Sequence, residues 1–283
     1  MNKKNIPLQI WQFIYRTFLV LLYLFPIAML VWVAFKSASD IALNILGVPK
    51  EWIGFENFTT AVEKMDFLKA LKNSAIVTVV STVCLCVFSA MAAWVLVRHK
   101  TKMSNFIFML FSVSMLIPFQ CVMLPLMKIM GRFGLGQFGI ELMNQQGLIL
   151  AYIGFGSAMS IMLYHGFIKG IPVELEEAAA IDGCSTPGIF FRIVLPLLGP
   201  TTTTVSIVNI MWIWNDYLLP SIVLSGKAEL RTLPLQTYKF FGSFSTNWGV
   251  AAAALLLIML PVIIFYIVAQ KKIIKGVVDG AVK

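Results

Sequence analysis

The stretch that decides the organisation of this chain is IPVELEEAAAIDGCSTPGIFFRIVLPLLGP, residues 171–200. Its first part predicts a short helix. Pro172 suits the first helical turn, because the N–H that proline lacks has no helical partner there. Three carboxylates follow, where the positive end of the helix favours them: Glu174, Glu176 and Glu177. Asp182-Gly183 predicts the end of this helix, since glycine tolerates the left-handed conformation that closes many helices.

A second short helix is predicted directly after this turn. Thr186 is a suitable N-cap residue, and Pro187 follows at the first helical position. An apolar stripe with helical spacing comes next, at Phe190, Ile193, Val194 and Leu197. The segment therefore predicts a helix–turn–helix with an acidic, small-sided first helix and an apolar second one. On this pattern alone, an ordinary loop hairpin is an open alternative.

The composition predicts a polytopic membrane protein. The chain has 283 residues, of which 59% are hydrophobic and 12% charged, and its mean hydropathy is +0.86. A soluble globular domain carries about 25% charged residues. The net charge of +9 is interpreted as cytoplasmic anchoring charge and not as nucleic-acid binding, because no basic stripe with interleaved aromatic residues occurs.

Six apolar segments are predicted to span the membrane as helices. They are Thr17–Phe35, Asn73–Val97, Met103–Met127, Gly147–Ile168, Gly199–Leu224 and Trp248–Gln270. The first is longer than the ~7–15-residue apolar part of a signal peptide, so we expect an uncleaved span. Outer loops are expected at 36–72, with a surface helix within Phe55–Leu71, and at the glycine-rich 128–146.

Basic residues cluster against the ends of these spans and predict the orientation. Arg98, Lys100 and Lys102 follow the second span, and Lys271, Lys272 and Lys275 follow the sixth. Such clusters stay in the cytoplasm. We therefore expect both termini inside, with a cytoplasmic N-terminus at 1–16, a six-span domain at 17–270 and a cytoplasmic tail at 271–283. The helix–turn–helix between spans four and five then lies in the cytoplasm.

The predicted fifth span carries an unusual set of polar residues, Asn209 and the pair Asn215-Asp216. A charge within a span is costly and usually faces a cavity or a partner. At about 1.5 Å per residue, Asp216 lies roughly 25 Å from the inner end of the span, near its outer edge. Two interpretations stay open: a place in a substrate path, or a structural role that includes capping a break before Pro220. The nearby Trp212, Trp214 and Tyr217 suit either sugar stacking or an interfacial aromatic belt.

Several kinds of chemistry have no motif in this sequence. No G-x-x-x-x-G-K-[S/T] loop occurs, so no ATP site is expected in the chain. Cys84, Cys86, Cys121 and Cys184 are interpreted as small hydrophobic residues, and neither a disulfide nor a metal site is expected. No nucleophile–base pair falls in a span, so we expect no enzyme. A secondary ion-coupled carrier remains an alternative, for which Asp216 is the one intramembrane ionisable candidate.

The sequence also resembles a known family. Glu177-Ala178-Ala179, Asp182-Gly183, Phe190, Ile193, Leu195 and Pro196 resemble the EAA loop of ABC-importer permeases. Further resemblance to the MalG-type permeases of sugar importers lies at Asn57-Phe58, Asn73-Ser74, Gly134-Leu135, Gly147–Leu150, Arg231–Pro234, Lys275-Gly276 and Gly280–Lys283. Pro187-Gly188 departs from the family, which more often has a bulky or polar pair there.

This resemblance implies a fold, a function and partners. It implies an all-α permease in the bacterial cytoplasmic membrane, where it contacts lipid and forms a sugar path, with oligosaccharides as the expected substrates. The implied partners are a MalF-type second permease, two ATPase subunits that bind ATP, and an extracytoplasmic solute-binding protein. The loop at 171–197 would couple to the ATPases through Glu174, Glu176, Glu177, Ala178, Ala179, Asp182 and Gly183. The sugar, and whether this subunit touches it, are not indicated.

Overall fold

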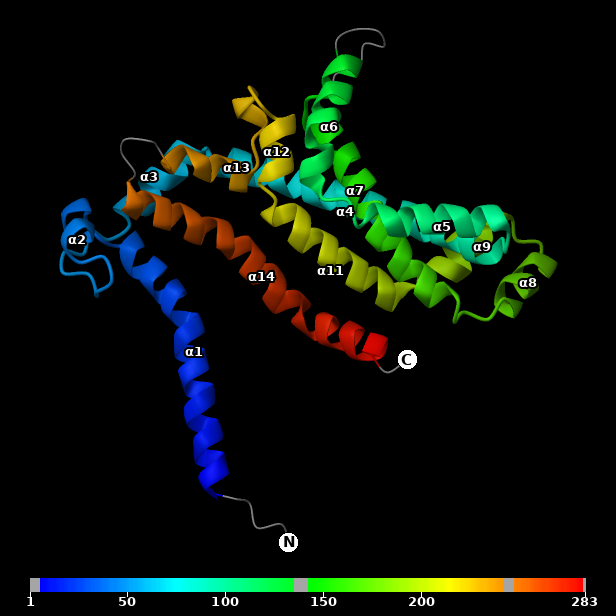
Figure 1. Ribbon diagram of the computed structural model, residues 1–283, viewed down its shortest axis with the longest axis horizontal. Helices are drawn as coiled ribbons and strands as arrows, with labels where there is room; N and C mark the ends of the chain where they lie inside the picture. The colour runs from blue at the N-terminus through cyan, green and yellow to red at the C-terminus, as the bar shows by residue number, and fades with distance from the viewer. Residues whose placement is uncertain (1–5, 135–141, 242–246, 282–283) are drawn as a thin grey trace. The chain divides into compact units, whose positions relative to one another are not determined.

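A computed structural model describes residues 6–134, 142–241 and 247–281 of the chain as a succession of helices (Figure 1). Within these ranges, four helices are long and apolar enough to cross a membrane, and two sharply bent helix pairs raise the number to six if each pair is one span. The predicted all-α, polytopic fold class is confirmed. The orientation and the exact number of spans stay predictions.

Short helices and helical turns alternate with the long helices along the chain. From the N-terminus they are α1 (Ile6–Ala34), α2 (Ala38–Leu43), α3 (Glu56–Met65), α4 (Phe67–Arg98), α5 (Lys102–Ser114), α6 (Phe119–Gly134), α7 (Gln145–Ile168), α8 (Glu174–Ile181), α9 (Thr186–Ile189), the π-helical turn η1 (Phe190–Val194), α10 (Leu195–Leu197), α11 (Gly199–Asn215), α12 (Leu218–Val223), the 3-10 turn η2 (Ala228–Leu230), α13 (Leu233–Thr237), the 3-10 turn η3 (Tyr238–Phe240) and α14 (Trp248–Ala281).

The chain forms two compact units. The first comprises Met1–Leu68 and Gln236–Pro261, and the second comprises Lys69–Leu235 and Val262–Lys283. Helix α14 therefore contributes to both, with Pro261 inside the helix at the boundary. It continues to Ala281, and a cytoplasmic tail at 271–283 stays a prediction.

In the first unit, the chain beyond α1 is fastened by a buried asparagine. The Asn57 side-chain amide donates to the carbonyl oxygens of Ala34 (3.0 Å) and Lys36 (3.1 Å). These carbonyls lie at the end of α1, where a helix leaves its carbonyl groups without helical partners. A Cβ atom at Gly249, the second residue of α14, would lie 2.5 Å from Asn57 Nδ2. Glycine at 249 therefore lets α14 approach this anchor.

A carboxylate holds the loop between α2 and α3 in the same unit. Asp40 accepts hydrogen bonds from the backbone N–H groups of Lys50 (2.7 Å) and Glu51 (3.3 Å). Burial acts to raise the pKa of Asp40, but these two N–H groups and the charge of Lys36 outweigh it and hold the pKa below its ordinary value. Asp40 is therefore ionised at neutral pH and fixes the loop as an anion.

The second unit is built on α4, α7 and α11, with apolar clusters toward both ends. At one end, residues such as Ala90, Tyr164 and Val205 pack with Phe190 and Val194 of the segment after α8. At the other, Leu85 and Tyr152 pack with Ile213 and residues of α12. Helix α5 also packs along α7. The predicted fourth span, Gly147–Ile168, corresponds to α7.

The predicted third span is not one straight helix. Helices α5 and α6 meet at an angle of 105°. Pro118 lies in this break, and proline both lacks an N–H and disfavours helical backbone at the preceding residue. Residues 103–127 were expected to form one span, and the break at Pro118 divides them into two helices.

The predicted fifth span, Gly199–Leu224, is also interrupted. Helix α11 ends at Asn215, and Asp216 has an extended backbone with φ −73° and ψ 129° before α12 begins at Leu218. The preceding helical segment, Thr186–Leu197, meets α11 at 78°. The straight part of this predicted span is therefore shorter than the sequence suggested.

We predict that Asn57→Ala loosens the chain after α1. Each carbonyl left without its partner costs about 1–3 kcal/mol, so amide exchange over residues 36–55 should accelerate when measured by mass spectrometry in nanodiscs. Thr59→Ala is the control, because its hydroxyl bonds only to Glu56 O on an exposed part of α3. Equal exchange in the two variants would contradict the anchoring role.

A candidate coupling loop and the polar contacts behind it

The turn between α8 and α9 is closed by a Schellman motif, a paired hydrogen-bond pattern that ends a helix. Cys184 N–H donates to Ala179 O and Gly183 N–H donates to Ala180 O, both at 3.0 Å. Gly183 has φ +85°, which is favourable for glycine and strained for other residues. The predicted helix end at Asp182-Gly183 is confirmed. The helix itself begins at Glu174, after Pro172, and its first turn contains all three predicted carboxylates.

The second helix of the loop differs from the prediction in two details. Ser185, and not Thr186, is the N-cap: its backbone is extended and its side chain accepts from Gly188 N–H. The π-helical turn η1 then adds a residue to the turn, so that Leu198 is buried where Leu197 was expected, and Leu197 is exposed. Phe190 and Val194 are buried as predicted.

Glu176 binds α8 to the end of α4. Arg98 donates through Nη2 (2.7 Å) and Nε (2.9 Å) to Glu176 Oε1, and Trp94 Nε1 donates to Glu176 Oε2 (2.9 Å). The same Arg98 also donates to Ile171 O (3.0 Å). The Trp94 ring packs on Phe190, with centroids 5.5 Å apart. Both helices of the loop therefore contact the last turns of α4.

Glu176 is 8% exposed, because an oppositely charged Arg98 reaches it from α4 and binds its carboxylate. This contact holds α8 against α4. A role of Glu176 in coupling stays a prediction. Ala179, one turn later, is also buried. The remaining coupling candidates are exposed: Glu174, Glu177, Ala178, Asp182 and Gly183.

Three hydrogen bonds join α7 to the segment that contains α11. Tyr164 donates to Thr202 Oγ1 (3.0 Å), Asn209 Nδ2 donates to Ser160 Oγ (3.1 Å), and Tyr152 donates to Asp216 Oδ2 (2.9 Å). They occur at successive levels along the two helices. Hydrogen bonds between membrane helices contribute about 0.6–2 kcal/mol each. Together they hold α7 and α11, the helices on either side of the loop, in one register.

Side chains of α4 and α11 both lie close to the α7 backbone at Gly156. A Cβ atom at this position would lie 2.8 Å from Leu85 Cδ1 of α4 and 3.1 Å from Asn209 Oδ1 of α11. Small residues permit such approaches between membrane helices. A Cβ at 156 would force the buried Leu85 side chain to shift, whereas a Cβ at Gly154 would meet nothing within 4 Å.

The three residues predicted for a substrate path have different surroundings in the described part of the chain. Asn209 is buried and also donates to Val205 O of its own helix. Asp216 accepts from Tyr152 at one oxygen and from the first N–H of α12, that of Leu218 (2.9 Å), at the other, which agrees with the structural interpretation. Asn215 is exposed and donates to Met211 O. A place for these residues in the path stays a prediction.

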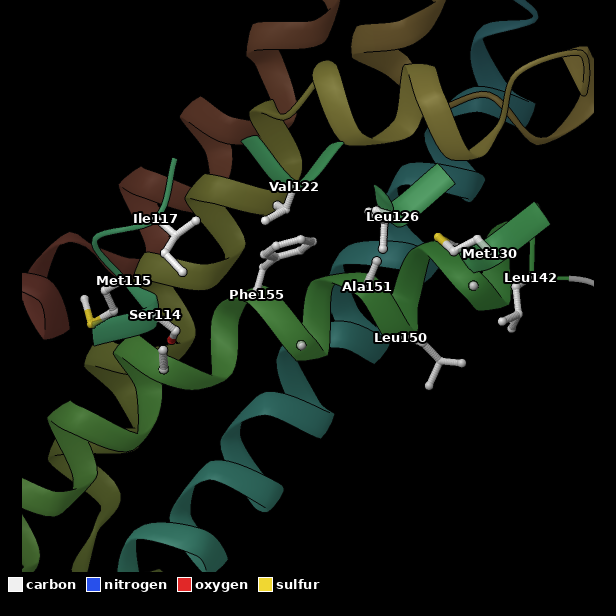
Figure 2. A pocket seen from close by; sticks show the side chains of 13 residues that line it. Ser114, Met115, Ile117, Val122, Leu126, Met130, Leu142, Leu150, Ala151 and Phe155 are labelled. Carbon is white, nitrogen blue, oxygen red and sulfur yellow. The ribbon is translucent and has the colours of Figure 1, made fainter. Parts of the chain in front are cut away.

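A large apolar cavity lies between the α5–α6 bend and α7 (Figure 2). Its volume is about 510 Å³, and its lining includes Ile117, Leu126 and Phe155. The one hydroxyl among its lining side chains, that of Ser114, donates to Phe111 O of its own helix. Sugars need polar partners for their hydroxyl groups, so this cavity is poorly suited to hold one.

Sequence reasoning missed several residues on which this arrangement depends. Trp94, Tyr152 and Ser160 lie in continuous apolar segments and carry no local signal of their contacts. Arg98 was counted only as part of a basic cluster. In the sequence, the one hint of this ion pair is that Arg98 at the end of the second span and the acidic helix after the fourth span are expected on the same side of the membrane.

Comparison with known proteins places the chain in a family. Residues 85–278 match the family described as "Binding-protein-dependent transport system inner membrane component". The chain is 43% identical over 265 residues to the probable starch degradation products transport system permease protein AmyC of Thermoanaerobacterium thermosulfurigenes, with 94% of this chain and 93% of the relative covered. It is 30% identical to the multiple sugar-binding transport system permease protein MsmG of Streptococcus mutans, with 96% of each covered.

A solved structure shares the fold. It is a chain of a bacterial ABC transporter involved in the import of the acidic polysaccharide alginate, with a TM-score of 0.80 and 20% identity over 96% of this chain and 98% of that one. The chain belongs to the family of binding-protein-dependent transport system inner membrane components, and it is a multi-pass membrane protein.

Gly156→Ala is predicted to destabilise the second unit. Overpacking of this kind costs about 1–3 kcal/mol, which should lower the unfolding temperature of the purified protein. Leu85→Ala in the same chain should recover part of the loss, because Leu85 supplies the nearest side-chain atom. Gly154→Ala is the matched control and should be neutral or stabilising. A similar loss in both glycine variants would refute the close-approach explanation.

Arg98→Ala is predicted to release α8 from the bundle. Breaking a fully buried ion pair costs about 3–5 kcal/mol. This pair is partly buried, so the loss should be smaller, and limited proteolysis should cut residues 171–185 faster. Lys100→Ala, two residues along and exposed, controls for lost positive charge. If both variants are cut at the wild-type rate, Glu176 does not depend on Arg98 for its position.

Proposed function

We propose that this chain is a transmembrane permease subunit of an ATP-driven ABC importer for sugars. The observation that carries the proposal is the coupling loop, whose acidic face is exposed while Glu176 and the second helix fasten it to the membrane helices. The family match and the sugar-transport names of two relatives support it. Oligosaccharides are the proposed substrate class.

The loop is proposed to transmit force from the ATPases to the bundle. A push on α8 reaches α4 through Arg98 and reaches α7 and α11 through the buried side chains around Phe190. The bonds between α7 and α11 make these helices respond together. Alternating access then requires that the ATPases bind the loop differently in the outward-open and inward-open states, since a partner with equal affinity for both shifts nothing.

The proposed assembly contains chains other than this one. A second, MalF-type permease would complete the path, two ATPase subunits would bind ATP, and an extracytoplasmic solute-binding protein would deliver the sugar. The family description supports dependence on a binding protein. The absence of a phosphate-binding loop from the sequence supports separate ATPases and no catalytic role for this chain. The proposed location is the bacterial cytoplasmic membrane, with both termini inside.

An ion-coupled carrier is the other function class raised by the sequence. It would need Asp216 to exchange a coupling ion or a proton during transport. Both Asp216 oxygens are engaged, by Tyr152 and by Leu218 N–H. This favours the structural role and the ATP-driven proposal. Uptake by the purified chain alone, driven by an ion gradient, would reverse that preference.

Glu177→Arg tests the coupling role directly. Charge reversal at an interface costs several kcal/mol, so capture of the ATPase subunits by the tagged permease should fall at least about tenfold, and sugar uptake should fall with it. Glu177 is exposed and outside the α8 anchor, so the membrane domain should stay folded.

Glu56→Arg is the matched control, since Glu56 is an exposed carboxylate in the first turn of another short helix, α3. It should leave capture and uptake unchanged. Normal capture and uptake by the Glu177 variant would remove this carboxylate from the proposed interface.

A further inference from the structure

The segment from Lys36 to Phe55 has two of its four charged side chains inside, while Lys50 and Glu51 are exposed. Lys36 is fully buried and its ammonium group donates to the carbonyl oxygens of Asn44 and Ile45. Asp40 is 5% exposed, and its carboxylate accepts from two backbone N–H groups. The charged side chains nearest to α1 are therefore satisfied within the segment and do not depend on water.

The same segment has its large apolar side chains outside. Leu43 is 90% exposed, Val48 63%, Trp52 63% and Phe55 68%, and Leu46 is also exposed. In a water-soluble loop the hydrophobic effect would drive these groups inward and leave the charges out. A segment with buried charges and exposed apolar side chains has the polarity that suits a hydrocarbon surrounding.

The position of the segment also places it at a membrane boundary. It begins two residues after the end of α1, a helix long and apolar enough to span. An antiparallel bridge between Lys36 and Trp52 ties its far end back to that point. The Trp52 ring stacks on Phe35, with centroids 4.5 Å apart and an interplanar angle of 8°. Tryptophan next to a span end is typical of the interface between lipid and water.

We propose that the 36–55 segment is an interfacial membrane anchor, with Leu43, Leu46, Val48, Trp52 and Phe55 inserted among lipid acyl chains next to the end of α1. The partner is the lipid bilayer itself. A hollow of about 370 Å³ beside the segment is lined mostly by apolar side chains, including Ile41, Ile45 and Trp248. The exposed Lys50 and Glu51 mark the polar side of the segment, which is proposed to lie at the level of the lipid headgroups.

A water-facing docking surface for another protein fits the same observations less well. Interfaces that form and separate are about as polar as the rest of a protein surface, whereas the exposed side chains here are mostly apolar. Continuity with α1 supplies a lipid surrounding at this point without any further partner. The proposal concerns lipid contact alone and does not depend on the transported substrate.

Spin labels can measure the depth of the segment in the assembled transporter. Leu43→Cys and Val48→Cys would be labelled separately after replacement of Cys84, Cys86, Cys121 and Cys184 by alanine, with retained sugar uptake as the check on folding. The control is Glu63→Cys, an exposed polar position on α3. Proteoliposomes of phosphatidylethanolamine and phosphatidylglycerol supply the membrane, and power saturation compares collisions with oxygen and with a nickel chelate.

Insertion about 5–10 Å below the headgroup boundary should raise the oxygen-to-nickel ratio at Leu43 and Val48 at least about threefold over Glu63. Equal ratios at all three sites would show a water-facing segment. Exclusion of both reagents, or protection that appears only after the solute-binding protein is added, would show a protein surface. Each of these outcomes would overturn the proposal.

A second measurement uses the unsubstituted chain. Phospholipids with a diazirine in the acyl chain, activated by light in the same vesicles, should label peptides from 43–55 and should not label the exposed side of α3. Labelling of neither region would count against insertion even if the cysteine variants fail to assemble.

Discussion

The ion pair between Arg98 and Glu176 is the contact on which the coupling loop depends. Helix α8 has eight residues, and isolated helices of that length are marginal in water. Of its eight residues, Glu176 and Ala179 are the two that are buried against the rest of the chain. A short helix held by so narrow a stripe needs a strong, directional anchor, and a carboxylate that receives three hydrogen bonds from Arg98 and Trp94 supplies it. The rest of α8 can then remain exposed.

The helices behind the loop differ in stiffness along their lengths. Helices α7 and α11 share hydrogen bonds at three levels, and Gly156 lets α4 and α11 approach the same face of α7. The α5–α6 bend, by contrast, borders an apolar cavity. If α8 couples to the ATPases as proposed, a force on it would reach a region tied by hydrogen bonds on one side and a region with a cavity on the other. Packed interiors transmit displacement, and voids absorb it.

Much of this arrangement was predictable from local sequence. The acidic first turn, the glycine-closed turn and the apolar second helix rest on capping and periodicity, which neighbouring residues determine. The bends at Pro118 and Asp216 were harder to place, because a proline or a charge signals an irregularity without giving its angle. The partner of Glu176 was not predictable, since Arg98 is 78 residues away along the chain. Such pairs become visible only when the helix packing is known, and the same holds for Tyr152 with Asp216.

Two segments of this chain satisfy their buried charges within the fold. In α8 the buried Glu176 carboxylate is paired with Arg98, while Glu174 and Glu177 are exposed. In the 36–55 segment Lys36 and Asp40 are inside while Leu43 and Val48 are exposed. The cost of an unpaired charge in hydrocarbon is large, and the cost of an exposed leucine there is absent. The same free-energy rule therefore requires a partner for each buried charge in both segments, and it allows Leu43 and Val48 to stay exposed where the 36–55 segment is proposed to meet lipid.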